Sequence, residues 1–224
     1  SHGQGKPVHR GWVFTTISLA LLMMAIDTTI VATALHSMQH ELQTSIDLAA
    51  WTITAYSLGF VVILPVAGKL SEQYGCRRVF LGSVAAFTVA SLFCGLAENI
   101  YVLVALRWLQ AAGGAGFTPS ATQIIVSYFR NARDRAVSLF GSIFSIGTMI
   151  GPIFGGLFVS YWSWRGIFLV NVPIGILVIA VARHVLDDTT HTPTRIDVVG
   201  AVLITITLCA CTLAVAQADG GSVV

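Results

Sequence analysis

The chain has 224 residues, of which 55% are apolar and only 10% are charged. Soluble domains carry about 25% charged residues, so this composition excludes an ordinary soluble globule and indicates a membrane protein. The net charge of +2 is small, and no basic stretch is interleaved with aromatic residues, which argues against a nucleic-acid partner. The four cysteines form no CxxC pair, so we predict neither a disulfide framework nor a zinc site.

Seven apolar runs are long enough to span a bilayer as helices, which takes about 20 residues each. Their length and uniform apolarity exclude the strands of a membrane barrel, which alternate with a period of two residues. The sequence therefore predicts an all-α, polytopic transmembrane helical bundle. The runs cover residues 12–35, 48–68, 79–97, 102–125, 137–160, 166–186 and 198–216.

The distribution of lysine and arginine predicts the orientation of these helices. Ten of the twelve basic residues fall in the N-terminal segment and in alternate loops, against Arg165 on the other side and Arg107 inside a helix. This bias places the N-terminus in the cytoplasm of a multi-pass protein in a plasma membrane or a bacterial inner membrane. We predict a cytoplasmic tail over 1–11, a six-helix unit over 12–186, a cytoplasmic linker over 187–197, a seventh helix over 198–216 and the start of an outer loop over 217–224.

An internal repeat relates the two halves of the six-helix unit at an offset of about 87 residues. Segments 63–78 and 150–165 match without a gap at six positions, including Arg78 and Arg165. Because each unit holds three helices, the second unit is inverted relative to the first. Inverted repeats are typical of secondary transporters. Such transporters have two six-helix halves, so we expect a C-terminal half that is missing from this chain.

Six motifs together resemble the major facilitator superfamily, and specifically its fourteen-helix drug/proton antiporter branch. The fullest match is GTMIGPIFGG at 147–156, which corresponds to the antiporter motif G-x-x-x-G-P-x-x-G-G. The others are DTTIVATAL at 27–35, GKLSEQYGCRRVFLG at 68–82, RWLQAAGGAGFTP at 107–119, WSWRGIFLVNVPIG at 162–175 and RIDVVGAVL at 195–203. The resemblance implies proton-coupled efflux of lipophilic or cationic small molecules by alternating access.

Asp27 and Arg107 are ionisable residues inside predicted helices, which makes them candidates for function. Helix rise places Asp27 about 12 Å and Arg107 about 8 Å below the outer surface, so two opposite charges lie at similar depth. Burial favours the neutral acid and a nearby arginine favours the carboxylate, so a carboxyl group between the two can load and release a proton. We predict that Asp27 takes up the proton and that Arg107 tunes it. The alternatives are a static buried pair and two unpaired groups that face water.

The motif in the fifth helix predicts a close helix contact. Gly147, Gly151 and Gly155 recur every four residues on one face, and small residues let another helix approach closely. Pro152 removes a backbone hydrogen bond and bends the helix. The resemblance implies that this segment, together with Gly156, forms a hinge and a seal against the opposite half. Ordinary tight packing would use the same spacing.

The loop between the second and third helices is predicted to act as a conformational gate. Gly68 and Gly75 permit a tight turn. Glu72, Arg77 and Arg78 can form a charge network that holds one conformation on the cytoplasmic side. The excess of positive charge on that side would by itself explain the arginines, but not the spacing of the glycines.

Polar and aromatic residues within the helices are candidates for the wall of a substrate cavity. Gln110 lies one turn from Arg107 and is predicted to form a polar part of that wall. The remaining candidates either line the cavity or pack in the core, and they are Tyr56, Phe117, Gln123, Phe144 and Asn171. His36 and His40 are four residues apart, but we expect them to be solvated at the outer end of a helix, and we predict no metal site.

The chain contains no G-x4-G-K-[ST], HExxH or GxSxG motif, so we predict no enzyme, no ATP site and no cofactor beyond the proton gradient. The expected partners are the lipid bilayer, protons, a small-molecule substrate and the missing C-terminal half. Two alternatives stay open, which are a non-transporting half that serves only in assembly and an exporter of an endogenous metabolite. A membrane enzyme or sensor would need a catalytic dyad facing a cavity, and none is evident.

Overall fold

The computed structural model describes residues 10–129, 132–187, 207 and 210. Its helices are α1 (Arg10–Glu41), α2 (Ile46–Tyr74), α3 (Cys76–Leu96), α4 (Ile100–Tyr128), α5 (Arg133–Tyr161), α6 (Gly166–Leu169) and α7 (Asn171–Val185). Six spans in this part are long and apolar enough to cross a membrane, with α6 and α7 together forming the sixth. The first six predicted helices are thereby confirmed. The predicted seventh helix and the segments that flank it lie outside the described residues, except for Asp187, Thr207 and Ala210.

The helices extend past the apolar runs because polar residues continue the backbone ladder at their ends. Residues 36–41 of α1 and 69–74 of α2 are mostly polar, yet they are helical. Side chains also accept hydrogen bonds from free backbone amides at the N-termini of α2 and α4. Ser45 Oγ accepts a hydrogen bond from the Leu48 amide at 3.2 Å, and Asn99 Oδ1 accepts one from the Tyr101 amide at 2.8 Å.

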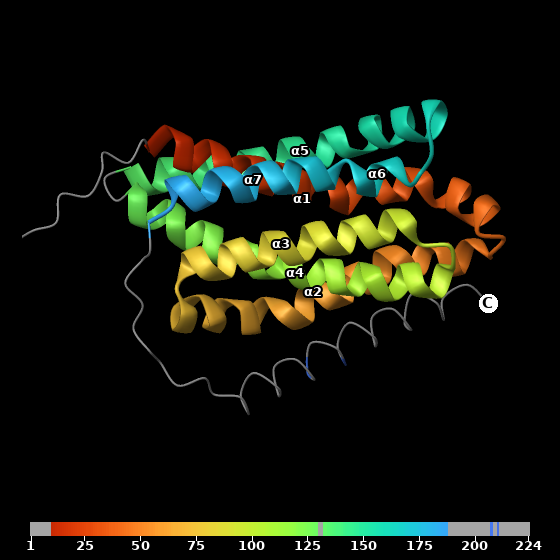
Figure 1. Cartoon of the computed structure of the whole chain (residues 1–224), viewed down its shortest axis with the longest axis horizontal. Helices are drawn as coiled ribbons and strands as arrows, with labels where there is room; N and C mark the ends of the chain where they lie inside the picture. Colours follow the sequence, from red (N-terminus) through yellow and green to blue (C-terminus); the bar gives the residue numbers. More distant parts are fainter. Residues whose placement is uncertain (1–9, 130–131, 188–206, 208–209, 211–224) are drawn as a thin grey trace, which may run out of the picture.

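Consecutive membrane spans run antiparallel and form two layers (Figure 1). In one layer α1 lies between α5 and α7, and in the other α4 lies between α2 and α3. The layers meet where α3 packs on α7 and where α1 packs on α2. This arrangement makes α1 and α4 the central helices of their layers, so their facing side chains are shielded on several sides.

The two layers follow the predicted repeat. Helices α2 and α5 are both 29 residues long, and both of their boundaries are 87 positions apart. Helices α1 and α4 end at Glu41 and Tyr128, which are again 87 positions apart. Helix α4 also starts at the end of the bundle opposite to the start of α1, as an inverted repeat requires (Figure 1). The architecture therefore supports two inverted three-helix units.

The glycine face of α5 packs on α1, which belongs to the same six-helix unit. The contacts pair Gly147 with Ala25, Gly151 with Thr29, and Gly155 with Ile30 and Thr33. A Cβ atom added at Gly155 would lie 2.9 Å from the Ile30 carbonyl oxygen and would overlap the Thr33 hydroxyl. Gly156 has open space around it and takes no part in the contact. The predicted close contact is therefore present, but its partner is α1, and the seal against an opposite half stays a prediction.

We predict opposite effects on stability for alanine at two adjacent positions of α5. Gly155→Ala forces α1 and α5 apart and should cost about 1–3 kcal/mol, the usual cost of overpacking. Gly156→Ala meets open space and gains helix propensity, so it should be neutral or stabilise by up to about 1 kcal/mol. Thermal unfolding of the full-length protein in detergent measures both. Equal effects of the two substitutions would show that the contact is not as tight as described.

Candidate functional site

Asp27 and Arg107 form an ion pair inside the bundle. Arg107 Nη1 lies 2.7 Å from Asp27 Oδ2, and each residue is only 1% exposed. Asp27 comes from α1 and Arg107 from α4, the central helices of the two layers. Removing two charges from water is costly, so such a pair persists only when further hydrogen bonds support it. The two residues that similar depth suggested as partners are thus in direct contact.

Three side chains donate hydrogen bonds to the Asp27 carboxylate. Oδ2 accepts from Arg107, whereas Oδ1 accepts from Gln110 Nε2 at 3.0 Å and from Asn171 Nδ2 at 2.9 Å. All three partners are donors, so the arrangement fits an ionised carboxylate. None of these contacts offers an acceptor for the proton of a neutral acid. Uptake of a proton by Asp27 therefore requires at least one of these side chains to turn.

A second set of hydrogen bonds ties the two amides to α3. Ser91 Oγ accepts from Gln110 Nε2 at 2.6 Å and from Asn171 Nδ2 at 3.4 Å. Gln110 Oε1 in turn accepts from Arg107 Nη1 at 2.6 Å. The network thus joins α1, α3, α4 and α7 around one carboxylate.

The Arg107 guanidinium also contacts two aromatic rings and borders a pocket. Its Cζ atom lies 4.2 Å from the ring centroid of Tyr56 and 5.5 Å from that of Phe168, distances that suit cation–π attraction. The pocket has a volume of about 290 Å³, and its wall also includes Met24, Ile53, Phe60, Val61 and Phe144. An apolar and aromatic wall with one charged group suits a lipophilic ligand. The Tyr56 hydroxyl is buried and has no hydrogen-bond partner among the described residues.

The predicted cavity residues fall into two groups. Those that line the pocket or contact Arg107 are Tyr56, Phe144 and Gln110. Phe117 is fully buried and packs edge to face on Phe80 at 6.1 Å between centroids, so it belongs to the core. Gln123 Oε1 accepts a hydrogen bond from Cys76 Sγ at 2.7 Å, near the start of α3 and away from the pocket.

The two glycines of the predicted gate occupy different environments. Gly75 joins α2 to α3 with φ of 88°, a backbone conformation that favours glycine because it has no Cβ atom. Gly68 lies inside α2, and open space surrounds the position of a Cβ atom there. The expectation of a turn therefore holds at Gly75 and not at Gly68, where the helix simply continues.

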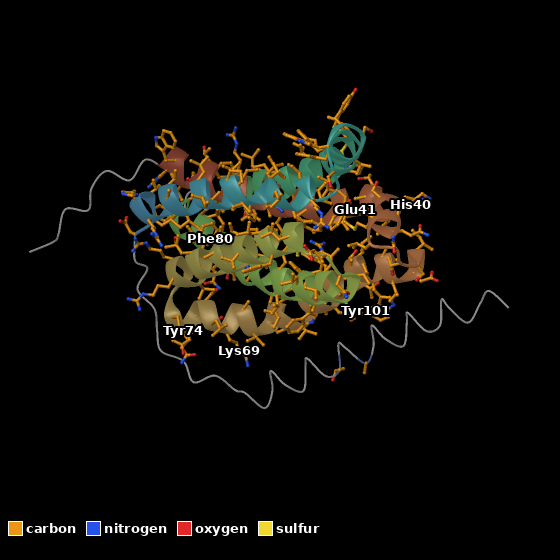
Figure 2. The ribbon with its side chains drawn as sticks, turned by 45° about the vertical axis from the view of Figure 1, so that its right-hand side comes forward. His40, Glu41, Lys69, Tyr74, Phe80 and Tyr101 are labelled. Atoms are coloured by element: carbon orange, nitrogen blue, oxygen red, sulfur yellow. The ribbon has the colours of Figure 1, made fainter. Side chains whose placement is uncertain are left out.

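The charges of the predicted gate are also separated. Arg77 Nη2 donates to the Arg183 carbonyl oxygen at 2.8 Å, which ties the start of α3 to the end of α7. Glu72 and Arg78 form no ion pair with one another among the described residues. The conformational role of these side chains stays a prediction. Lys69 and Tyr74 lie at this end of the bundle, and His40 and Glu41 lie at the opposite end (Figure 2).

Sequence reasoning did not single out Ser91, and it left Asn171 between a cavity wall and packing. Polar residues in apolar helices are a general signal, but hydroxyl groups often bond their own helix and need no partner elsewhere. Thr52 Oγ1, for example, donates to the Ala49 carbonyl one turn earlier. Only the packing of α7 against α1 and α3 shows that Ser91 and Asn171, unlike such residues, form hydrogen bonds between helices.

An inverted pair of three-helix units, with a buried ion pair beside a pocket, has the architecture of one half of a secondary transporter. A sequence profile described as Major Facilitator Superfamily matches residues 17–216, and the chain belongs to this family. The family consists of transporters rather than enzymes, which agrees with the prediction that the chain is not an enzyme. It also makes the chain part of a multi-pass membrane protein.

The chain is similar to two curated proteins and to one solved structure of a transporter. It is 36% identical over 202 residues to the multidrug resistance protein Stp of Mycobacterium tuberculosis, which covers 89% of this chain and 38% of that protein. It is 37% identical over 203 residues to the cephamycin export protein CmcT of Amycolatopsis lactamdurans, which covers 88% of this chain and 42% of that protein. The solved structure of the POT family transporter PepTSo is similar with a TM-score of 0.71 at 12% sequence identity. The similarity covers 85% of this chain and 40% of the PepTSo chain, and it supports the fold only. The chain thus spans less than half the length of each of these proteins.

We expect the buried pair to be essential for stability in a way that surface pairs are not. Arg107→Leu leaves the Asp27 carboxylate buried without its cation and should cost about 3–5 kcal/mol. Adding Asp27→Asn removes the stranded charge and should recover part of that loss. The exposed pair between Glu41 and Arg165 is the control, because Glu41→Gln should cost about 1 kcal/mol or less.

Thermal unfolding of the full-length wild type and of these three variants in detergent gives the comparison. A loss for Arg107→Leu no larger than that for Glu41→Gln would show that the buried pair does not hold α1 and α4 together.

Proposed function

We propose that the full-length protein exports small molecules in exchange for protons, by alternating access. The proposal is supported above all by the Asp27 carboxylate, which is buried and bound by three donors beside a ligand-sized pocket. The names of the similar proteins support an export role, since one is a multidrug resistance protein and one is a cephamycin exporter. The energy comes from the proton gradient rather than from ATP.

The proton binds to Asp27, and the charge of Asp27 determines how strongly the substrate binds. With Asp27 ionised, the pair with Arg107 is neutral and the pocket wall carries no net charge. Once Asp27 is protonated, Arg107 remains as an uncompensated cation against the Tyr56 ring. The same event demands an acceptor that the present hydrogen bonds do not supply, so the helices around Asp27 are pushed toward another arrangement.

This change in charge is large enough to release a cationic substrate. Two unit charges about 6 Å apart at an effective dielectric constant of about 20 repel by about 3 kcal/mol, which weakens binding roughly a hundredfold. A lipophilic cation is therefore bound to the ionised state and expelled from the protonated one, which is one-for-one exchange. A neutral lipophilic compound would be coupled only through the change in hydrogen bonding.

In the membrane, the proposed orientation follows the positive charges, with the N-terminus and the α2–α3 connection in the cytoplasm. Protons then enter from the outer side and reach Asp27 when the cavity opens there. A further six-helix half would close the cavity on the other side, and the two halves would rock about it. The proposed membrane is the plasma membrane or a bacterial inner membrane.

We predict that Asp27→Asn abolishes proton coupling. The amide keeps the size of the carboxyl group but cannot gain or lose a proton at neutral pH. Substrate-stimulated proton flux into liposomes that hold the full-length protein should fall to background. Substrate binding should become independent of pH, and a cationic substrate should bind roughly a hundredfold more weakly, because the amide leaves Arg107 without its anion. The control is Asp47→Asn, the same substitution at an exposed position at the start of α2. Unchanged proton flux in Asp27→Asn would overturn the proposal.

We predict that Asn171→Ala makes Asp27 easier to protonate. The variant loses one donor to the carboxylate, and hydrogen bonds to charged groups contribute about 1.5–3 kcal/mol. The midpoint of the pH dependence of substrate binding should move toward higher pH by about one to two units. Gln123→Ala removes an amide that does not contact Asp27, so its midpoint should stay at the wild-type value. A midpoint that does not move in Asn171→Ala would remove Asn171 from the proton site.

A further inference from the structure

A groove lies between α3 and α4 on the lateral surface of the bundle. Its main part has a volume of about 500 Å³ and an almost wholly apolar lining. Buried Ala90 and Gly113 lie at its base, and the half-exposed side chains of Val89, Phe93 and Leu109 form its rim. In a helix bundle that spans a membrane, such an exposed apolar surface faces lipid chains. The groove therefore fits an elongated apolar ligand.

The groove continues to a positively charged end. A second hollow of about 380 Å³ shares Gly82 and Ser83 with the first and is also lined by Tyr74 and Arg78. Arg78 is one helical turn before Gly82, so the two residues lie on the same stripe of α3. This end lies near the Gly75 connection between α2 and α3, on the side that the positive charges assign to the cytoplasm.

Arg78 has a charge that the described residues do not compensate. Its side chain is exposed and takes part in no hydrogen bond or ion pair with the described residues. Its repeat equivalent, Arg165, bonds Glu41 at 3.0 Å and also donates to the carbonyl oxygens of Gly95 and Ala97. The arginine at this position of the repeat thus has hydrogen-bond acceptors at one end of the bundle, whereas at the other end it has none among the described residues.

The length of the groove matches one leaflet of a bilayer. From Gly82 to Phe93 the rise of α3 is about 16 Å, and half of the hydrocarbon core of a bilayer is about 15 Å. Arg78 lies about 6 Å beyond Gly82, at the level where the headgroup of a lipid in that leaflet begins. The positive end of the α3 dipole also lies there, because α3 begins at Cys76.

We propose that the groove binds a phospholipid with an anionic headgroup, with one acyl chain between α3 and α4 and the phosphate on Arg78. Tyr74 supplies a further hydrogen-bond donor at the headgroup. A zwitterionic lipid brings its own cation to this site, whereas an anionic headgroup leaves its charge to Arg78. A basic residue near a membrane surface contributes about 1 kcal/mol to binding of anionic lipid, which corresponds to about a fivefold preference. The inference does not depend on proton coupling or on the direction of transport.

The test compares two lipids on the full-length protein after delipidation in detergent. Phosphatidylglycerol and phosphatidylcholine with the same acyl chains are titrated separately, and native mass spectrometry reports the first lipid that binds. The wild type should prefer phosphatidylglycerol about fivefold, and Arg78→Gln should lose this preference while Arg78→Lys keeps it. Arg10→Gln removes one exposed charge at the same end of the bundle outside the groove, so its preference should stay at the wild-type value.

The apolar part of the site is tested by filling it. A Cβ atom at Gly82 meets open space, so Gly82→Leu should fold and should block the groove for both lipids, whereas Gly82→Ala should bind them with little change. Equal affinity of the wild type for both lipids, or an unchanged preference in Arg78→Gln, would overturn the charged part of the site. Unchanged binding of both lipids by Gly82→Leu would overturn the proposal that an acyl chain binds in the groove.

Discussion

The structure depends on a single buried charge pair. Asp27 and Arg107 are removed from water, and such a pair is stable only when every remaining hydrogen-bonding site has a partner. Gln110 and Asn171 meet that requirement, and Ser91 holds both amides in place. Four helices are positioned as a result. The same donors suit an ionised carboxylate, and they offer no acceptor for the proton of a neutral acid.

Close backbone contacts hold the rest of each layer, since lipid provides little hydrophobic driving force between helices. Glycines of α5 let α1 approach in one layer. In the other layer, a Cβ atom at Gly59 of α2 would lie 2.8 Å from the Trp108 carbonyl oxygen of α4. The central helices α1 and α4 are therefore each contacted closely by α5 and α2, which are equivalent helices of the repeat. The charge pair lies between two such clamped helices, which limits the ways in which it can rearrange.

The buried and paired charges of this bundle depart from its internal symmetry. The repeat positions that correspond to Asp27 and Arg107 are occupied by Gly114 and Ala20, so the ion pair occurs once. Arg165 is bonded to the ends of α1 and α3, whereas its equivalent Arg78 is left open. The shared positions build the scaffold, and the unequal ones distinguish the two ends of the membrane protein.

The sequence by itself determined the class of fold, six of the helices, the repeat and the presence of two opposite charges at similar depth. These features depend on apolar length, local spacing and helix rise, which are properties of each segment alone. It did not determine which faces meet, because every side of a membrane helix is apolar and the period that orients a soluble helix is weak. Hence the sequence left open whether the glycine face of α5 packs within its own half or seals against an opposite one, and whether Phe117 lines a cavity or packs in the core. The structure shows that the glycine face contacts α1 and that Phe117 packs in the core. Only the tertiary structure brought Asn171 and Ser91, from α7 and α3, to the network around Asp27, since contacts between distant segments arise from packing rather than from local pattern.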